Sequence, residues 1–436
     1  MGGKIFGGPG KTSIRAAWGL YYTSIEDLHL FYEVGDAPYG LYWPSIVPPL
    51  FEEPFRTRSD GSSQQQRFPF ILPTPGDPKN KTLDYSVFLP IQGSPGYDIH
   101  NTVPYAEHYN FSIQRQLGGS TALTLAYVGT QGHKLIAQRE SNPGDPALCL
   151  SLRGSGVLAG SPQCGPGGEL GLYTRPNGTI VNGTRGPLGP DFGSNSYTSN
   201  AANSNYNALE VTVERRAADL TFLAAYTYSK AIDNSSAYGT WINFMNYRKS
   251  RALSQFDITQ NFVLSYNYEI PFHRAFSSAP RRLTEGWSLN GITRFATGFP
   301  VTVTQSGDRS LTGTSGVDEP DFLGGLVFQD PRHAGPDGAP NRYFNKTAFR
   351  SEALGGVGNS SRRFFHGPGF NNWDFGLHKL TRITERASIL IRAEFFNLAN
   401  HAQFGNPNGN FASSRFGTVT SAKQPRIGQV SAKVIW

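Results

Sequence analysis

Ten segments of this sequence alternate apolar and polar residues, and this alternation is the feature that most limits the fold. A period of two belongs to a β-strand whose two faces meet different surroundings. Nine of the ten segments have 9 to 13 residues, whereas strands of soluble proteins have about 5–6. A tilted strand that crosses a bilayer needs about 9–11 residues. The sequence therefore predicts an all-β, antiparallel transmembrane β-barrel, with strands at residues 12–22, 105–117, 121–129, 207–215, 220–230, 259–270, 287–304, 370–380, 387–397 and 426–436.

The connections between these segments alternate between long and short along the whole chain. The long connections are residues 23–104, 131–205, 231–258, 305–369 and 398–425. The short connections are residues 118–120, 216–219, 271–286 and 380–386. Outer-membrane barrels have short periplasmic turns and long extracellular loops. We therefore expect all long connections at the extracellular end, and we expect the last strand to end in the periplasm.

The alternation also predicts which side chains face lipid and which face the lumen. The aromatic residues predicted on the lipid face are Trp18, Tyr22, Tyr109, Tyr127, Tyr226, Tyr228, Tyr266, Tyr268, Trp287 and Trp373. Several lie near strand ends, as expected for the aromatic girdles of a membrane protein. The opposite face carries Glu210, Glu214, Glu269 and Glu394. Regular alternation favours a polar lumen over paired catalytic acids, and we expect Arg294 and Arg392 to pair with these carboxylates across strands.

The seventh segment, residues 287–304, is the longest and contains Gly298 and Pro300. Proline has no N–H to donate to a neighbouring strand, and glycine inside a strand often marks a bulge. We expect a bulge at this point and a continuation of the strand through Val301 and Val303.

The composition favours a membrane barrel over a soluble enzyme or a nucleic-acid-binding protein. Charged residues make up 16% and aromatic residues 13% of the chain, and the charged share lies below the ~25% of typical soluble domains. The net charge of +7 is scattered along the chain. No basic run is interleaved with aromatic residues, so we predict no nucleic-acid partner. No apolar stretch of about 18 residues occurs, so we predict no transmembrane helix.

The two cysteines, Cys149 and Cys164, lie in one stretch rich in glycine and proline. Two residues do not supply the four ligands of a structural zinc site. We expect a loop disulfide, which fits an oxidising compartment; the alternative is two unpaired thiols.

Motifs of catalysis and cofactor binding are not found in the sequence. It has no His-Glu-x-x-His and no Gly-x-Ser-x-Gly pattern. Gly10-Lys11-Thr12 resembles the end of a phosphate-binding loop, but Ile5 stands where that motif needs a glycine. We interpret the isolated His108, His378 and His401 as lumen or loop residues. The sequence therefore predicts no enzyme, no cofactor and no metal ligands.

The final segment ends in an aromatic residue after alternating apolar positions. Trp436, Val434, Ala432 and Val430 share one face of the predicted strand. This pattern resembles the signal read by the barrel-assembly machinery, although phenylalanine is the commoner last residue. We expect these residues to act as an assembly signal and this strand to close a barrel.

Several motifs together resemble one family. They are Tyr105-Ala-Glu-His-Tyr-Asn-Phe-Ser-Ile-Gln-Arg-Gln-Leu117, Tyr226-Thr-Tyr-Ser-Lys-Ala-Ile-Asp233, Gly286-Trp-Ser-Leu-Asn-Gly-Ile-Thr293 and Arg392-Ala-Glu-Phe-Phe-Asn-Leu-Ala-Asn-His-Ala-Gln-Phe-Gly405. From Tyr105 onward the chain resembles the barrels of Oar-like TonB-dependent transporters. The resemblance implies a place in the cell outer membrane, contact with the lipid bilayer and lipopolysaccharide, and uptake of a bulky nutrient whose identity the sequence does not give.

Members of that family carry a signal peptide, an immunoglobulin-like regulatory domain, a plug and a barrel of about 22 strands. The resemblance implies that residues 1–436 form the C-terminal portion of such a barrel, without the other three parts. Under this interpretation the barrel is partial, Met1 is an internal start or the edge of a split or cut sequence, and TonB acts only through a plug absent from this chain.

Two other functions stay open at this point. One is a passive porin or an outer-membrane adhesin, and the other is a soluble secreted β-protein such as a glycan-binding module or hydrolase. Tyr39, Trp43 and Trp241 lie in long connections, where they would either stack on a ligand or pack against their own barrel.

Overall fold

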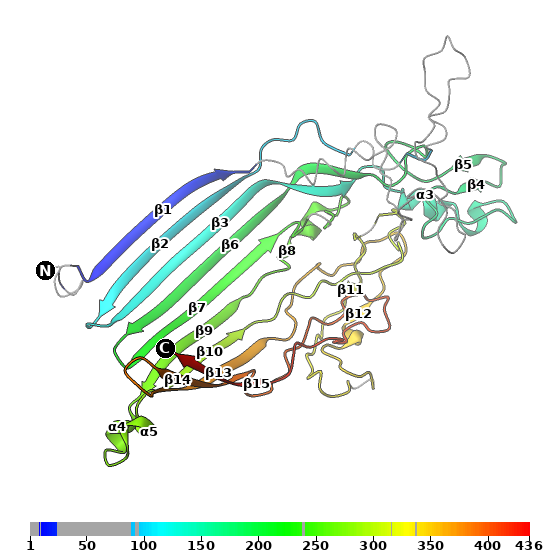
Figure 1. Cartoon of the computed structure of the whole chain (residues 1–436). Helices are drawn as coiled ribbons and strands as arrows, with labels where there is room; N and C mark the ends of the chain where they lie inside the picture. The colour runs from blue at the N-terminus through cyan, green and yellow to red at the C-terminus, as the bar shows by residue number, and fades with distance from the viewer. Residues whose placement is uncertain are drawn as a thin grey trace, which may run out of the picture.

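One curved antiparallel sheet forms the body of the molecule. The computed structural model describes residues 8, 10–23, 89–91, 96–237, 240–314, 316–335 and 338–436. Within these residues, ten strands follow one another across the sheet in chain order, and each pairs with the next (Figure 1). They are β1 (Thr12–Tyr22), β2 (Tyr105–Leu117), β3 (Thr121–Glu140), β6 (Ser196–Arg216), β7 (Leu220–Asp233), β9 (Gln260–Ile270), β10 (Trp287–Ala296), β13 (Phe370–Arg382), β14 (Ser388–Phe396) and β15 (Ile427–Ile435).

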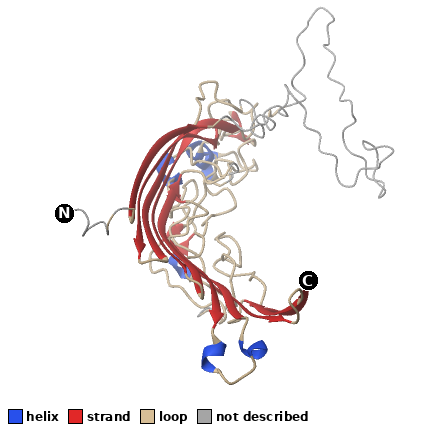
Figure 2. Ribbon diagram, turned by 60° about the vertical axis from the view of Figure 1, so that its left-hand side comes forward, coloured by secondary structure: helices blue, strands red, loops and turns tan. Residues whose placement is uncertain are grey.

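The sheet curves like part of a barrel wall, and loops gather on its concave side (Figure 2). In the part of the chain that the structure describes, β1 and β15 are the two edges, so the barrel is not closed. A short strand, β8 (Ala252–Leu253), pairs with β7 beside this sheet. The predicted all-β antiparallel fold is confirmed.

All ten predicted strands are present, but two are much longer than expected. β3 and β6 continue past the predicted residues 121–129 and 207–215, where they pair with each other beyond the rest of the wall. Their register shifts twice, between Gly132 and Leu135 and between Leu135 and Ala137. A bulge changes the face on which following side chains lie, so the period-two pattern breaks while the strands go on.

The expected continuation of the seventh strand is wrong. β10 ends at Ala296. A Cβ on Gly298 would lie 2.2–2.3 Å from the carbonyl oxygens of Gly367 and Pro368, so the backbone leaves the sheet in close contact with another segment. Val301 and Val303 then pack in a hydrophobic core, with exposed fractions of 1% and 0%. Burial among loop residues, not strand pairing, explains their apolar character.

For the four long connections after β3, the prediction that they share one end of the sheet is confirmed; most of the first, residues 23–104, lies outside the described residues. The turns at the opposite end are short, apart from the one between β9 and β10, which holds α4 (Phe272–Ala275) and α5 (Arg281–Thr284) (Figure 1). The long connections hold α3 (Pro146–Ser151), the hairpin of β4 (Leu172–Thr174) and β5 (Ile180–Asn182), and the pair β11 (Asp321–Phe322) and β12 (Phe349–Arg350). They also hold 3-10 helices at Gly154–Gly156, Tyr247–Ser250 and Lys346–Ala348.

The hydrophobic core lies in the long connections and not in the wall. Among the described residues, the largest fully buried apolar side chains are Phe344, Phe416, Leu152, Ile242, Leu311, Val301, Val303 and Val317. Seven buried residues form what we call the loop core: Val301, Val303, Phe344, Ala348, Phe349, Phe365 and Phe416. We call the folded long connections together the loop assembly.

The strand register places apolar residues on one face of the wall from β1 to β15. On the last strands, Val434, Ala432 and Val430 lie opposite Ile389, Ile391 and Ala393. On the first strands, Trp18 lies opposite Tyr109. This face is the convex one, because the side chains of the other face, such as Ser229 and Ala231, are buried under the loop assembly.

Candidate functional site

The concave face of the wall carries a groove of about 580 Å³ that both polar and apolar residues line. Side chains from six strands, β6 to β14, line it. Near its end a row of polar contacts crosses four strands. Asn290 Nδ2 and His378 Nδ1 lie 2.9 Å apart, His378 Nε2 lies 3.3 Å from Glu394 Oε1, and Gln429 Nε2 donates to Glu394 Oε2 (2.7 Å). The predicted polar lumen face is thus present as a continuous surface.

The expected pairing of the inward arginines with glutamates does not occur at Arg294. Its Nε donates to Asn261 Oδ1 (3.0 Å), and its guanidinium lies 5.3 Å from the centre of the Phe370 ring. The register explains this, because Arg294 stands opposite Val263 and Asn372 rather than a carboxylate. Arg392 stands opposite His378 and Ser431.

Two further inward residues, Glu214 and His108, take local partners. Glu214 pairs with Arg216 of its own strand (2.5 Å). His108 Nδ1 lies 2.9 Å from Thr130 Oγ1 on the neighbouring strand. Among the described residues, no group of three or more His, Cys, Asp or Glu side chains is gathered as a metal cluster.

Buried ion pairs link the loop assembly to the end of β7 that adjoins the long connections. Arg362 Nη2 lies 2.7 Å from Asp233 Oδ1, and both side chains are buried. Ser254 Oγ and Ser236 Oγ also donate to this carboxylate, at 2.5 and 2.6 Å. A buried charge is tolerated when it is paired and hydrogen-bonded. Asp233 therefore holds two long connections against the wall.

Two further pairs lie in the same assembly. Lys249 Nζ lies 3.0 Å from Glu319 Oε2, yet burial outweighs this attraction and raises the pKa of Glu319 to about 7. His366 Nε2 lies 2.8 Å from Asp257 Oδ2. Burial alone would raise the pKa of Asp257, but hydrogen bonds from His366 and from the Ala231 N–H keep it below its usual value.

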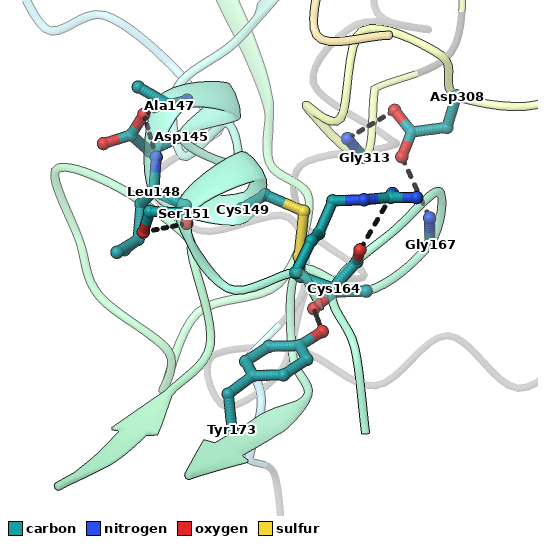
Figure 3. The surroundings of a disulfide bond; sticks show 12 residues. Asp145, Ala147, Leu148, Cys149, Ser151, Cys164, Gly167, Tyr173, Asp308 and Gly313 are labelled. Atoms are coloured by element: carbon teal, nitrogen blue, oxygen red, sulfur yellow. Dashed lines mark hydrogen bonds between the residues drawn. A yellow bond between two sulfur atoms is a disulfide. The ribbon is translucent and has the colours of Figure 1, made fainter. Parts of the chain in front are cut away.

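A disulfide joins Cys149 and Cys164 inside the connection between β3 and β6, with their Cα atoms 5.3 Å apart (Figure 3). Both cysteines are buried, and Leu152, Val157, Tyr173 and Leu311 pack around them. The Tyr173 hydroxyl donates to the Gly168 carbonyl (2.5 Å). The disulfide therefore cross-links this connection beside a small core that Leu311, from the connection between β10 and β13, helps to build.

Of the loop aromatic residues considered from the sequence, Trp241 is half-buried next to the fully buried Ile242. Tyr39 and Trp43 lie outside the described residues.

The comparison with protein families decides what this architecture is. Residues 4–429 match the family model described as the outer membrane beta barrel domain. The chain belongs to this family. It is an outer-membrane β-barrel protein, which rules out the soluble secreted β-protein as an alternative.

Solved structures give likenesses of fold for this outer-membrane barrel. The outer membrane transporter YddB from Escherichia coli is 9% identical, with a TM-score of 0.39, covering 77% of this chain and 33% of its own. The ferripyoverdine receptor of the Pseudomonas aeruginosa outer membrane is 10% identical, with a TM-score of 0.39, covering 98% and 31%. The ferric-catecholate import receptor Fiu from E. coli is 12% identical, with a TM-score of 0.34, covering 86% and 31%. The chain spans about a third of each of these proteins, and no curated protein sequence matches it.

Aromatic side chains on the convex face fit the membrane setting of this barrel. Near the strand ends that adjoin the long connections, the Phe295 ring lies 6.2 Å from that of Phe262 and 5.6 Å from that of Trp373. At the other end, Trp287 packs edge-on against Phe272 (6.0 Å). Amphipathic rings at both interfaces are what a bilayer favours. No helix in the described part of the chain is long and apolar enough to span a membrane.

Sequence reasoning did not identify the residues that build the loop assembly. Phe344, Phe349, Phe365 and Phe416 stand in stretches without any regular apolar period, so no strand or helix pattern marked them. The one indication was the number of phenylalanines in these otherwise polar connections. Such large apolar side chains are usually buried, so several of them together indicate a shared hydrophobic core.

Proposed function

We propose that this chain forms part of the barrel of an Oar-like TonB-dependent transporter that takes up a bulky nutrient. One observation carries the proposal: the long connections fold into an ordered loop assembly at one end of the sheet and lie over its polar concave face. In this proposal the loop assembly presents a folded surface to a ligand outside the cell. The polar side chains of the concave face then line the route through the barrel. The motifs that resemble this family point the same way.

In this proposal, residues 1–436 supply the C-terminal wall, and the rest of the barrel and a plug lie outside this sequence. Open sheet edges are costly in lipid, because every backbone N–H and C=O needs a partner there. We infer that neighbouring barrel strands cover the outer edges of β1 and β15. The plug, not the wall, is proposed to engage TonB.

The test is uptake in cells that carry or lack the gene. Compounds removed from a complex growth medium are measured by mass spectrometry in both strains and in a strain without TonB. Transport predicts that a large solute is depleted only when both the gene and TonB are present. Depletion that persists without TonB would support a passive porin instead. Unchanged depletion, with loss of attachment to surfaces, would support an adhesin.

We also propose that Trp436, Val434, Ala432 and Val430 form the signal read by the barrel-assembly machinery. All four side chains lie on the convex face, and Trp436 is 91% exposed. Trp436→Asp is expected to lower the amount of heat-modifiable barrel in outer-membrane fractions several-fold. Lys433→Asp on the opposite face is the matched control. Equal amounts of assembled protein for wild type and Trp436→Asp would refute the role.

A further inference from the structure

The connection between β9 and β10, residues 271–286, differs from the other turns at its end of the sheet. It contains the two short helices α4 and α5 and projects past the ends of the strands (Figure 1). The other described turns at this end hold no helix. Two adjacent antiparallel strands need only about 2–5 residues to be joined. We call residues 271–286 the helical turn, and its extra length is not explained by strand connection.

Contacts with two strands hold the helical turn against the convex face of the wall. Trp287 Nε1 donates to the Leu283 carbonyl (2.7 Å), and the Trp287 ring packs edge-on against Phe272 at 6.0 Å between centroids. Lys379 Nζ donates to the Arg282 carbonyl (2.8 Å) and lies 5.5 Å from the centre of the Trp287 ring. Trp287 and Lys379 stand opposite each other in the register, on the convex face. The helical turn therefore adjoins the end of the surface that meets lipid.

Two large apolar side chains of the helical turn are exposed beside this surface. Phe276 is 58% and Leu283 is 66% exposed. Leu283 is tied to Trp287 through its own carbonyl, and the Phe276 ring lies 6.3 Å from the ring of Phe272. Single exposed apolar residues are ordinary on a surface that faces water. These two adjoin a face that lipid covers, so lipid is the apolar medium nearest to them.

The helical turn also carries a positive charge. It contains three arginines and one glutamate. Arg281 pairs with Glu285, with 3.7 Å between Nε and Oε1. Arg274 and Arg282 are exposed, and neither forms an ion pair within the described part of the chain. The anions nearest to the end of a lipid-facing surface are the phosphate groups of lipid headgroups, which attract basic residues.

We propose that the helical turn binds the periplasmic leaflet of the outer membrane. Phe276 and Leu283 enter the apolar region of this leaflet, and Arg274 and Arg282 bind the phosphate groups of anionic phospholipids. Outer-membrane barrels have their short turns in the periplasm, which decides the leaflet. Interfacial helices combine the same two kinds of side chain and lie with their apolar face about 5–10 Å deep at the headgroup boundary. The proposal depends on the orientation of the barrel and not on transport.

The experiment measures the depth of the helical turn by electron paramagnetic resonance. A nitroxide is attached to Ala275→Cys, an exposed position next to Phe276, in the full chain purified from outer membranes. The two native cysteines form the disulfide, so the introduced cysteine is the reactive thiol. The protein is reconstituted into phosphatidylcholine vesicles with or without phosphatidylglycerol. The accessibility of the nitroxide to oxygen and to a water-soluble nickel complex gives its depth.

We expect the nitroxide at residue 275 to lie about 5–10 Å deep at the headgroup boundary. A nitroxide at Met245→Cys, which is 45% exposed in a long connection, is the control and is expected to lie in water. Phe276→Ser together with Leu283→Ser is expected to move the nitroxide at residue 275 into water. Leu323→Ser together with Val327→Ser, two exposed apolar residues of a long connection, is the matched change and should leave its depth unaltered.

Phosphatidylglycerol is expected to draw the nitroxide deeper than phosphatidylcholine alone, because the headgroups then carry net negative charge. Arg274→Gln together with Arg282→Gln should abolish this difference. Arg248→Gln together with Arg415→Gln removes the same charge from exposed positions in the long connections and should preserve it. Heat-modifiable gel mobility shows that the wall of each variant is folded.

Three results would overturn the proposal. A nitroxide at residue 275 as accessible to nickel as the one at residue 245 would mean that the helical turn stands free in water. Protection from nickel that survives Phe276→Ser with Leu283→Ser would mean that protein, not lipid, covers it. A depth in the wild type that is the same with and without phosphatidylglycerol would show that the arginines do not bind anionic headgroups.

Discussion

The wall and the loop assembly place their apolar side chains in opposite ways. The wall buries no large apolar side chain under its own strands; it turns them outward, and residues such as Trp18 and Val430 remain 67% and 77% exposed. The loop assembly encloses its apolar side chains, and Phe344 and Phe416 are fully buried. The difference follows from the solvent, because lipid receives the apolar face of the wall and water surrounds the loops.

This contrast has a consequence for the polar groups. On the wall, polar side chains face the lumen and find partners on neighbouring strands, as in the contact of His378 with Glu394. In the loop assembly, carboxylates are buried and need specific counter-charges, as Asp233 needs Arg362. The wall is therefore tolerant of changes on its lumen face, whereas the loop assembly is sensitive to single changes.

The largest expected effect is in the loop core. Phe344→Ala removes a fully buried ring that contacts Phe365 and Phe416 edge-on, at 5.1 Å between centroids in each case. Loss of burial and the cavity left behind are expected to destabilise the loop assembly by about 3–5 kcal/mol. Native-state proteolysis of the long connections measures this. Phe262→Ala, on the lipid face, is the control; if it opens the loops equally, the two regions do not have separate cores.

The second-largest expected effect tests which face of the wall meets lipid and which faces the lumen. Leu264 lies on the convex face in the middle of β9, opposite Ala224 and Thr293. Leu264→Arg is expected to cost about 2–4 kcal/mol, because an arginine near the bilayer midplane loses its hydration. Urea unfolding in lipid vesicles gives the free energy.

The matched change, Ser265→Arg, puts the same side chain one residue further along the strand, on the face that lines the groove. We expect little change in the free energy of unfolding. Equal destabilisation by the two arginines would show that the faces have been assigned wrongly.

The sequence predicted the wall well, because two solvents impose a regular alternation on every strand that separates them. β1 and β2 begin and end at the predicted residues. Prediction failed where the strands leave the membrane. Past Gly129, bulges disturb the alternation of β3, and at Gly298 a close backbone contact ends β10 before Val301 and Val303.

The loop assembly was beyond sequence reasoning for a different reason. Glu169 and Asp308 come from connections on opposite sides of four wall strands, and only the tertiary fold brings them together. Glu169 is buried, and Leu311 and Tyr173 pack around the neighbouring disulfide. No local sequence pattern predicts contacts between segments that lie so far apart in the chain.

A smaller effect is expected from the disulfide. It closes a segment with a separation of 15 residues, for which the chain-entropy model gives roughly 3 kcal/mol as an upper figure. Replacing Cys149 and Cys164 together by alanine is expected to make the connection between β3 and β6 more sensitive to protease. Heat-modifiable gel mobility, which reports the wall, should not change. Reducing agent provides the control, since it should affect the wild type and leave the double variant unaltered.

The smallest effect is the pH dependence of the loop assembly. The pKa of Glu319 is raised by burial from 4.5 to about 7, so the folded form binds this proton more tightly than the unfolded form. The stabilisation is then fully present below pH 4.5 and is lost as the pH rises through about 7. We expect the loop assembly to lose on the order of 1–3 kcal/mol between pH 5 and pH 8. The lowered pKa of Asp257 acts with the opposite sign, but only below its usual value of 3.8.

Glu319→Gln separates this contribution from that of Glu169, which has a similarly raised pKa. The variant cannot ionise at this position, so protease protection should fall less between pH 5 and pH 8 than in the wild type. The part that remains is expected to come from Glu169. A wild-type protection that rises over this range would mean that Lys249 keeps Glu319 ionised, and the loop assembly would then resemble a surface ion-pair network rather than a buried core.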